Sequence, residues 1–295
     1  MSEGSKQADS LHRFLLEGQP VRGELVRLDN SWQAALEHRD YPAPVRELLG
    51  QAMAAASLLA STLKFDGAMT LQVQGDGPVN LLVVQCTSEL VIRGTAQVQE
   101  APSAGASFRE MLGDGTMAIT IEQKGQSERY QGIVPMEGEN LAACLEAYFE
   151  RSEQLPTRLW LSADADAASG LLLQIVPGED LSGDDWNRAV MLADTVKDEE
   201  LRQLPVMHLL HRLYHEDDVR LFDASPVSFR CSCSREKIAD VLRRLGQEEV
   251  DDILKEQGQV EVGCDFCGRQ YHFDRVDAAG LFAEVGRSQG SPTRH

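Results

Sequence analysis

The chain has 295 residues, of which 42% are hydrophobic and 25% are charged, and its formal net charge is −19 at pH 7. This length and composition are typical of a globular protein with one or two domains and a substantial core. The excess of acidic residues argues against a nucleic-acid-binding surface, which needs lysine and arginine on at least one face.

Neither a signal peptide nor a membrane span is expected. Residues Met1–Ser5 lack a basic stretch followed by an apolar core. The longest apolar helical stretch, Ala52–Leu63, is interrupted by serine and threonine and falls short of the roughly 18 apolar residues of a span. The sequence predicts a cytoplasmic protein.

Residues 1–176 are predicted to form one α+β domain. A helix beginning at Pro44 carries apolar residues at helical spacing, and a second helix covers Leu141–Phe149. Runs of neighbouring strands with separate helices favour antiparallel sheets with packed helices over a doubly wound sheet. The predicted strands are Val21–Leu28, Met69–Gln74, Val79–Gln85, Leu90–Arg93, Met117–Glu122, Tyr130–Val134, Leu159–Leu161 and Leu171–Val176.

Glycine pairs mark the turns of this domain. The run Gly75-Asp76-Gly77-Pro78 lies between two predicted strands, and Lys124-Gly125 lies between two others. A dinucleotide-binding interpretation of Gly75 and Gly77 fails because the third glycine is absent and a strand follows instead of a helix. Both segments are therefore predicted to be hairpin turns.

Residues 177–226 are predicted to form a helical acidic linker. They hold twelve acidic and five basic residues, a net charge of −7. Ala189–Val196 and Leu204–Leu213 have apolar residues at helical spacing, and each is followed by a charged segment, Lys197–Glu200 and Glu216–Asp218. Helices shorter than about 12–15 residues are marginal without packing. We therefore expect the linker to depend on its neighbours for its fold.

Residues 227–287 are predicted to form a small domain that contains four of the six cysteines, followed by a polar tail at 288–295. Helices are expected at Glu236–Leu245 and at a segment ending with Ile253–Gln257. Strands are expected at Val260–Val262 and Gln270–Phe273, on either side of the second cysteine pair.

The four cysteines form two pairs, Cys231-x-Cys233 and Cys264-x-x-Cys267. Two such pairs with a spacer of this length are typical of a tetrahedral zinc site. A module of about sixty residues has little core of its own, so metal binding would supply much of its folding free energy. The same thiols can also be oxidised, and either pair can close a local disulfide that removes two zinc ligands.

The spacing alone leaves three functions open. The zinc site can be purely structural in a binding protein, or it can be a redox switch. Alternatively, Cys264-x-x-Cys267 can serve a thiol–disulfide oxidoreductase, although no thioredoxin-like strand–helix–strand pattern precedes it.

The remaining candidates are weaker. His208, His211 and His215 share one helical face, but the leucines between them favour a plain helix surface. His272 follows the second cysteine pair, yet four thiolates already satisfy zinc. Cys86 and Cys144 lie in apolar segments and are expected to be buried core thiols.

The cysteine pattern resembles the switch of the family of 33 kDa redox-regulated chaperones, the 33 kDa chaperonins. The resemblance extends in order along nearly the whole chain. It includes Arg22-Gly23-Glu24-Leu25, Gly75-Asp76-Gly77-Pro78-Val79, Arg93-Gly94, Tyr130-Gln131-Gly132-Ile133-Val134-Pro135, Tyr148-Phe149-Glu150-Arg151-Ser152-Glu153-Gln154 and Phe229-Arg230-Cys231-Ser232-Cys233.

The resemblance implies an ATP-independent holdase of the cytoplasm rather than an enzyme. It implies that the reduced form is quiet and holds one zinc ion through Cys231, Cys233, Cys264 and Cys267. Oxidation would form the disulfides Cys231–Cys233 and Cys264–Cys267, release zinc, and unfold the zinc domain and linker. The implied partners are unfolding client proteins, a second copy in the oxidised form, and ATP-dependent foldases downstream.

Overall fold

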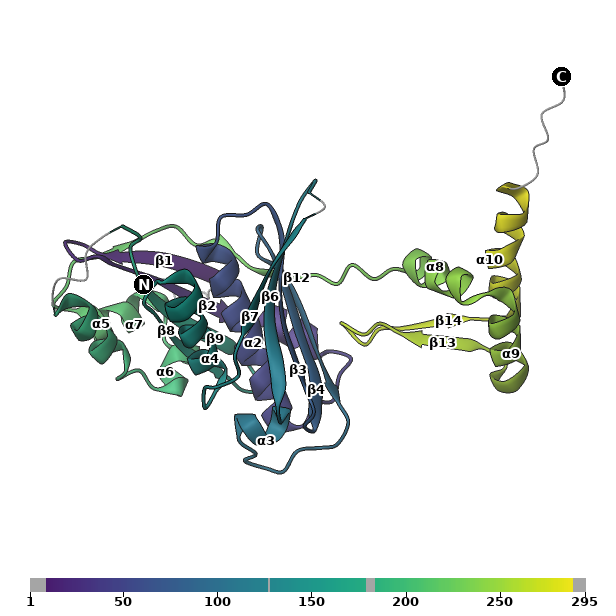
Figure 1. Ribbon diagram of the computed structural model, residues 1–295, viewed down its shortest axis with the longest axis horizontal. Coiled ribbons are helices and arrows are strands. Elements are labelled where there is room, and N and C mark those ends of the chain that lie inside the picture. Colours follow the sequence, from purple (N-terminus) through teal and green to yellow (C-terminus); the bar gives the residue numbers. More distant parts are fainter. Residues whose placement is uncertain (1–8, 127, 179–183, 289–295) are drawn as a thin grey trace, which may run out of the picture. The chain divides into compact units, whose positions relative to one another are not determined.

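The computed structural model describes residues 9–126, 128–178 and 184–288. The chain divides between Arg230 and Cys231 into two compact units (Figure 1). The first contains two six-stranded sheets with packed helices, and the second contains helices and a two-stranded sheet. The predicted α+β class is confirmed. The finer division at residues 176 and 226 stays a prediction, and the polar tail lies, apart from Ser288, outside the described residues.

The first sheet has the order β10-β1-β2-β9-β8, and β11 also pairs with β1. All of its neighbouring strands are antiparallel. Its strands are β1 (Ser10–Leu16), β2 (Val21–Leu28), β8 (Thr157–Ala163), β9 (Ala168–Ile175), β10 (Val219–Leu221) and β11 (Ser225–Pro226).

The second sheet has the order β12-β5-β4-β3-β6-β7. It is antiparallel except where β12 runs parallel to β5. Its strands are β3 (Gly67–Gly75), β4 (Val79–Thr87), β5 (Val91–Val98), β6 (Gly115–Gln123), β7 (Arg129–Val134) and β12 (Ser228–Phe229).

Helices cover both sheets of the first unit. They are α1 (Asn30–Leu36), α2 (Ala43–Thr62), α3 (Phe108–Leu112), α4 (Leu141–Tyr148) with the π-helical turn η1 (Phe149–Glu153), α5 (Asp185–Ala193), α6 (Asp198–Gln203) and α7 (Val206–Tyr214). The second unit contains α8 (Arg235–Leu245), α9 (Gln247–Gln257), β13 (Val260–Gly263), β14 (Gln270–Phe273) and α10 (Arg275–Ser288).

Helix α2 forms the centre of the first unit and packs against strands of both sheets (Figure 1). Pro42 precedes its first residue, and its run from Ala52 to Ala60 is buried on every side. A helix that is apolar all round must be covered all round, which explains its position. In the described parts of the chain, no helix combines the length and apolar character that a membrane span requires.

Most predicted elements are found, with small shifts at their ends. The turns at Gly75–Pro78 and Lys124-Gly125 are also present, the second with Gly125 at a φ of 80°. Several elements were not predicted from the sequence: strand β1, the short strands β10–β12, and the helices α1, α3, α6 and α10. Helix α6 begins within the segment that the sequence marks only as charged, because three of its six residues are acidic. Its start is capped by the Glu200 carboxylate, which accepts from the Lys197 N–H at 3.0 Å.

The helices α5, α6 and α7, called here the linker helices, pack on one face of the first sheet. Val206, Leu209, Leu210 and Leu213 form the apolar stripe of α7. They share a core with residues of the sheet that include Phe14, Leu25, Leu171 and Leu173. Each linker helix has nine residues or fewer. Helices this short are marginal without packing, which accounts for their position against the sheet.

Gly23 makes this packing possible, because it leaves room for the ring of Phe14 directly across the strand pair. A Cβ at Gly23 would lie 2.0 Å from Phe14 Cζ, and the buried ring of Phe14 in turn meets Tyr214 of α7 at a centroid distance of 6.1 Å. We therefore expect Gly23→Ala to weaken linker docking by about 1–3 kcal/mol. Amide hydrogen exchange should show faster exchange across α7.

The double variant Gly23→Ala/Phe14→Leu is the matched control, because the smaller side chain vacates the space that the new methyl group needs. It should restore part of the lost protection in α7. Unchanged exchange in the single variant would contradict the steric account, and α9 in the second unit serves as the internal reference.

Candidate metal centre

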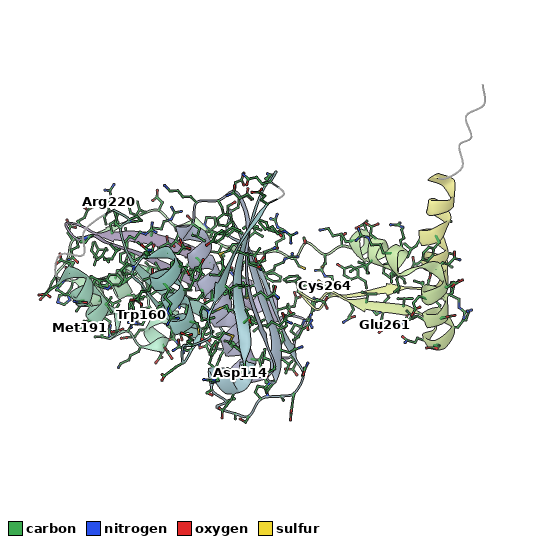
Figure 2. The ribbon with its side chains drawn as sticks, viewed as in Figure 1. Asp114, Trp160, Met191, Arg220, Glu261 and Cys264 are labelled. Carbon is green, nitrogen blue, oxygen red and sulfur yellow. The ribbon has the colours of Figure 1, made fainter. Side chains whose placement is uncertain are left out.

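The four clustered cysteines come from two short segments of the second unit. Cys231 and Cys233 precede α8, whose first turn is capped by the Ser234 hydroxyl accepting from the Lys237 N–H at 3.3 Å. Cys264 and Cys267 lie in the turn between β13 and β14. Figure 2 labels Cys264 just beyond Glu261 of β13.

Backbone hydrogen bonds shape the turn that carries the second pair. The Cys264 N–H donates to the Arg269 carbonyl at 2.9 Å, and the Gly268 N–H donates to the Cys264 carbonyl at 2.8 Å. Gly268 has a φ of 72°, a conformation that glycine adopts without the steric cost of a Cβ. The turn thus brings the sulfurs of Cys264 and Cys267 toward the same point.

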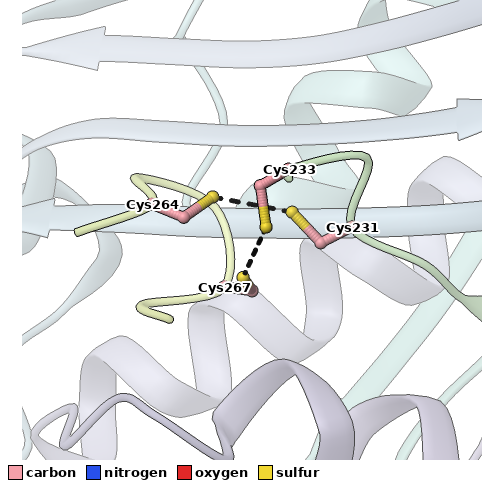
Figure 3. Close-up of side chains that lie close together, drawn as sticks. All are labelled: Cys231, Cys233, Cys264 and Cys267. Carbon is pink, nitrogen blue, oxygen red and sulfur yellow. Dashed lines mark hydrogen bonds between the residues drawn. The ribbon is translucent and has the colours of Figure 1, made fainter. Parts of the chain in front are cut away.

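The sulfurs of the two segments meet in one cluster (Figure 3). Cys231 Sγ lies 3.6 Å from Cys264 Sγ, and Cys233 Sγ lies 3.5 Å from Cys267 Sγ. All four sulfurs lie within 4.8 Å of one another. Tetrahedral zinc with bonds of about 2.3 Å separates its sulfurs by roughly 3.8 Å, so the cluster has the dimensions of a zinc site. None of the six cysteines, all of which are described, forms a disulfide.

The four thiols differ in their electrostatic surroundings. Burial raises the pKa of Cys231, and it raises the pKa of Cys267 to about 12. Burial also acts on Cys233, but hydrogen bonds from Tyr271 and from the neighbouring thiols outweigh it and lower the pKa of Cys233 to about 7. Four sulfurs this close cannot all carry negative charge without a cation between them. The arrangement is suited to a divalent metal ion.

The core around this cluster is small. It contains seven buried hydrophobic residues: Ala239, Leu242, Val250, Leu254, Val260, Phe273 and Ala278. Arg235 adds an ion pair with Asp277 at 2.7 Å, and its guanidinium carbon lies 4.2 Å from the centre of the Phe273 ring. These contacts join α8, β14 and α10 but leave little apolar burial to stabilise the unit.

The weaker candidates from the sequence take no part in this cluster. His208 and His211 lie on the exposed face of α7, and His215 is exposed directly after its last residue, as expected for a helix surface. His272 is exposed, with Nδ1 3.4 Å from Glu261 Oε1. Among the described residues, the cysteine cluster is the one group of three or more side chains arranged to hold a metal ion.

The two isolated cysteines are buried, as predicted. Cys86 and Cys144 are both 0% exposed in the core between the two sheets. Burial raises the pKa of Cys86 to about 12 and also raises the pKa of Cys144. Both thiols are therefore shielded from solvent oxidants and poor in thiolate.

The sequence pattern does not point to one side chain of the cluster, Tyr271. It was predicted only as part of a strand, but its hydroxyl donates a hydrogen bond to Cys233 Sγ at 3.1 Å. The alternation of β14 could have indicated that Tyr271 and the buried Phe273 share one side of the strand. Nothing in the sequence indicated that this side faces the first cysteine pair.

Comparisons with known proteins cover nearly the whole chain. The family model described as Hsp33 protein matches residues 9–274. The 33 kDa chaperonin of Methylobacillus flagellatus is 50% identical over 291 residues, which cover 98% of this chain and 99% of that protein. The 33 kDa chaperonin of Nitrosococcus oceani is also 50% identical, covering 97% and 99% of the two chains.

The fold has a counterpart among solved structures. The crystal structure of the 33 kDa chaperonin of Thermotoga maritima superposes with a TM-score of 0.79. It covers 94% of this chain and 99% of its own, at 22% sequence identity. At that identity the likeness supports the fold.

Proposed function

Because the chain belongs to the Hsp33 family, we propose that it is a redox-regulated, ATP-independent holdase that binds unfolding proteins under oxidative stress. It acts by binding clients rather than by catalysis. The observation that carries the proposal is the cluster of four sulfurs within 4.8 Å, held in a unit with a small core. The linker that precedes this unit has short helices that share their core with the first sheet.

In the reduced protein, Cys231, Cys233, Cys264 and Cys267 hold one zinc ion. When bound, zinc keeps the sulfurs as thiolates and joins the segment before α8 to the turn between β13 and β14. The buried positions of Cys264 and Cys267, which are 8% and 6% exposed, keep water from competing for the site. This is the quiet state of the chaperone.

Oxidation converts the two cysteine pairs into the disulfides Cys231–Cys233 and Cys264–Cys267. One sulfur of a pair attacks peroxide and becomes a sulfenic acid, and its pair-mate then displaces water to close the bond. Formation of each disulfide from two thiolates transfers two electrons to one peroxide, which takes up two protons from solvent and leaves as two waters. Each also removes two ligands, so zinc is released. The sulfurs of Cys231 and Cys264, and those of Cys233 and Cys267, are also close, so disulfide mapping must test the pairing.

Loss of the metal unfolds the second unit, and the linker follows. Strand β12 is the last element before the second unit. It has only two residues and ends two positions before Cys231. Detachment of the linker helices would uncover apolar residues on the first sheet, including Phe14, Leu25 and Leu171, together with the stripe of α7. These surfaces are available to clients. Two oxidised copies then associate, and clients pass to ATP-dependent foldases in the cytoplasm.

The test is to oxidise the zinc-loaded protein with peroxide under mildly unfolding conditions. We expect loss of four thiols and one zinc ion, loss of helical circular dichroism signal, and a gain in suppression of client aggregation, all with the same time course. Oxidised protein that keeps its helicity and protects no client would contradict the proposal.

Two further outcomes identify the competing functions. Zinc that stays bound under the same oxidant would favour a purely structural site. Catalytic turnover of a dithiol substrate, abolished by Cys264→Ser, would favour an oxidoreductase. The position of Cys264 and Cys267 between two strands, instead of at the start of a helix, speaks against that activity.

A further inference from the structure

Tyr271 joins the two halves of the cysteine cluster. It lies on β14, four residues after Cys267, yet its hydroxyl donates to Cys233 Sγ at 3.1 Å, across 38 positions of sequence. The hydroxyl thus reaches from the segment that carries the second cysteine pair to a sulfur of the first.

The core of the second unit holds the Tyr271 ring in place. Tyr271 is half-buried and packs against the same hydrophobic cluster that contains Phe273, two residues further along the strand. The residue between them, His272, points to the other side, where it is exposed beside Glu261. Because the ring is fixed by packing, its hydroxyl points in one direction, toward Cys233 Sγ.

A second contact steadies the first cysteine pair without touching a sulfur. The Lys237 ammonium donates to the Ser232 carbonyl at 2.6 Å, between the two cysteines. Lys237 therefore holds the backbone of this segment, whereas Tyr271 contacts a sulfur directly. The two roles can be separated by substitution.

We propose that Tyr271 is a positioning residue of the thiol switch, whose hydrogen bond withdraws electron density from Cys233 Sγ, strengthens metal binding and slows attack of this sulfur on electrophiles. Hydrogen bonds from neighbouring groups to metal ligands are known to orient them and tune the metal. A donor to sulfur disperses the negative charge that four thiolates concentrate around one divalent ion. The proposal rests on the proposed function and assigns one residue that sets the threshold of that switch.

The test compares zinc-loaded wild type with Tyr271→Phe, which keeps the ring and removes the hydroxyl. Alkylation by iodoacetamide, resolved by mass spectrometry for each cysteine, should become roughly 3- to 10-fold faster at Cys233, the change that one hydrogen bond supplies. The other three cysteines should change by less than about twofold. Zinc affinity, measured by competition with a chromophoric chelator, should fall by about 10-fold.

Cobalt substitution distinguishes an electronic effect of the Tyr271 hydroxyl on the sulfur from a loss of packing. In the Co²⁺-loaded Tyr271→Phe variant, the sulfur-to-cobalt charge-transfer band should shift to lower energy, because the sulfur has become more electron-rich. The visible bands that report tetrahedral geometry should stay in place.

The control is Lys237→Met, which loosens the segment around Ser232 but leaves Tyr271 in contact with Cys233. It should raise alkylation of Cys231 and Cys233 alike and leave the charge-transfer band unshifted. Equal acceleration at all four cysteines in Tyr271→Phe, or an unshifted band with unchanged alkylation, would overturn the proposal. None of these measurements uses chaperone activity, so the inference can fail while the redox function stands, and the reverse also holds.

Discussion

Removal of the proposed zinc ion from the reduced protein is expected to unfold residues 231–288 while the two sheets of the first unit remain folded. The second unit has a core of seven buried hydrophobic residues and a sheet of two strands. A two-stranded sheet is marginal alone, and a unit of this size buries little apolar surface. Metal ligation supplies roughly 10–16 kcal/mol in small zinc modules, more than such a core can replace.

Amide hydrogen exchange after treatment with a strong chelator checks this expectation. Protection should vanish in α8, α9 and β13 and persist in β2, β3 and β9, which lie inside the two large sheets. Adding zinc back should restore it. The variant Cys264→Ser should behave like the chelated protein at limiting zinc. Protection of α9 that survives chelation would show that the second unit folds without metal.

The stability of the first unit should fall as the pH rises through about 7, because of Glu24. This residue is 3% exposed on β2, on the side of the strand that faces α2 with Val26 and Leu28. Burial raises the pKa of Glu24 to about 7, and the Ser61 hydroxyl and the guanidinium groups of Arg13 and Arg22 offset only part of this effect. The folded protein therefore binds a proton that the unfolded chain has released.

The sign of the pH dependence follows from this difference. The ordinary pKa of glutamate is 4.5, and the folded value is higher. The contribution of Glu24 is fully present below pH 4.5 and is lost as the pH rises through the folded pKa of about 7. The free energy of unfolding therefore falls by about 3 kcal/mol as the pH rises from the unfolded to the folded pKa of Glu24.

Urea denaturation of the first unit at pH 5 and pH 8 measures this loss, with exchange of β2 and β9 amides as the site-resolved signal. Glu24→Gln cannot ionise, so its pH slope should be flatter and its stability at pH 8 should exceed that of wild type. The matched control is Glu89→Gln, at an exposed carboxylate, which should keep the wild-type slope. If Glu24→Gln kept the wild-type dependence of stability on pH, Glu24 would not be the cause of that dependence.

The sequence was informative wherever a local pattern has one structural meaning. The four cysteines could be assigned to one cluster because few other arrangements use two close thiol pairs at this spacing. Strand β2 and helix α2 were recognisable because each has an apolar pattern bounded by turn residues or proline. The glycine turn after β3 was recognisable for the same reason.

Features that depend on distant partners could not be predicted. Strand β1 contains His12 and Arg13 within an apolar run, and its pairing with β10 and β11 depends on residues more than two hundred positions away. The carboxylate of Glu24 looks solvent-exposed in the sequence, since glutamate is rarely buried. The contact of Tyr271 with Cys233 depends on how two segments meet, and the residue pattern of neither segment encodes it.

The pairing of β1 with β10 and β11 also has a consequence for synthesis of the chain on the ribosome. One edge of β1 pairs with β2 at once, but the partners of its other edge, Val219–Leu221 and Ser225–Pro226, are about two hundred residues from emerging. At a synthesis rate of roughly 5–20 residues per second, that edge stays unpaired for about 10–40 seconds before its partner strands emerge. An open strand edge is a template for wrong pairing. The nascent protein therefore passes through an interval in which it has the same vulnerability as an unfolding client.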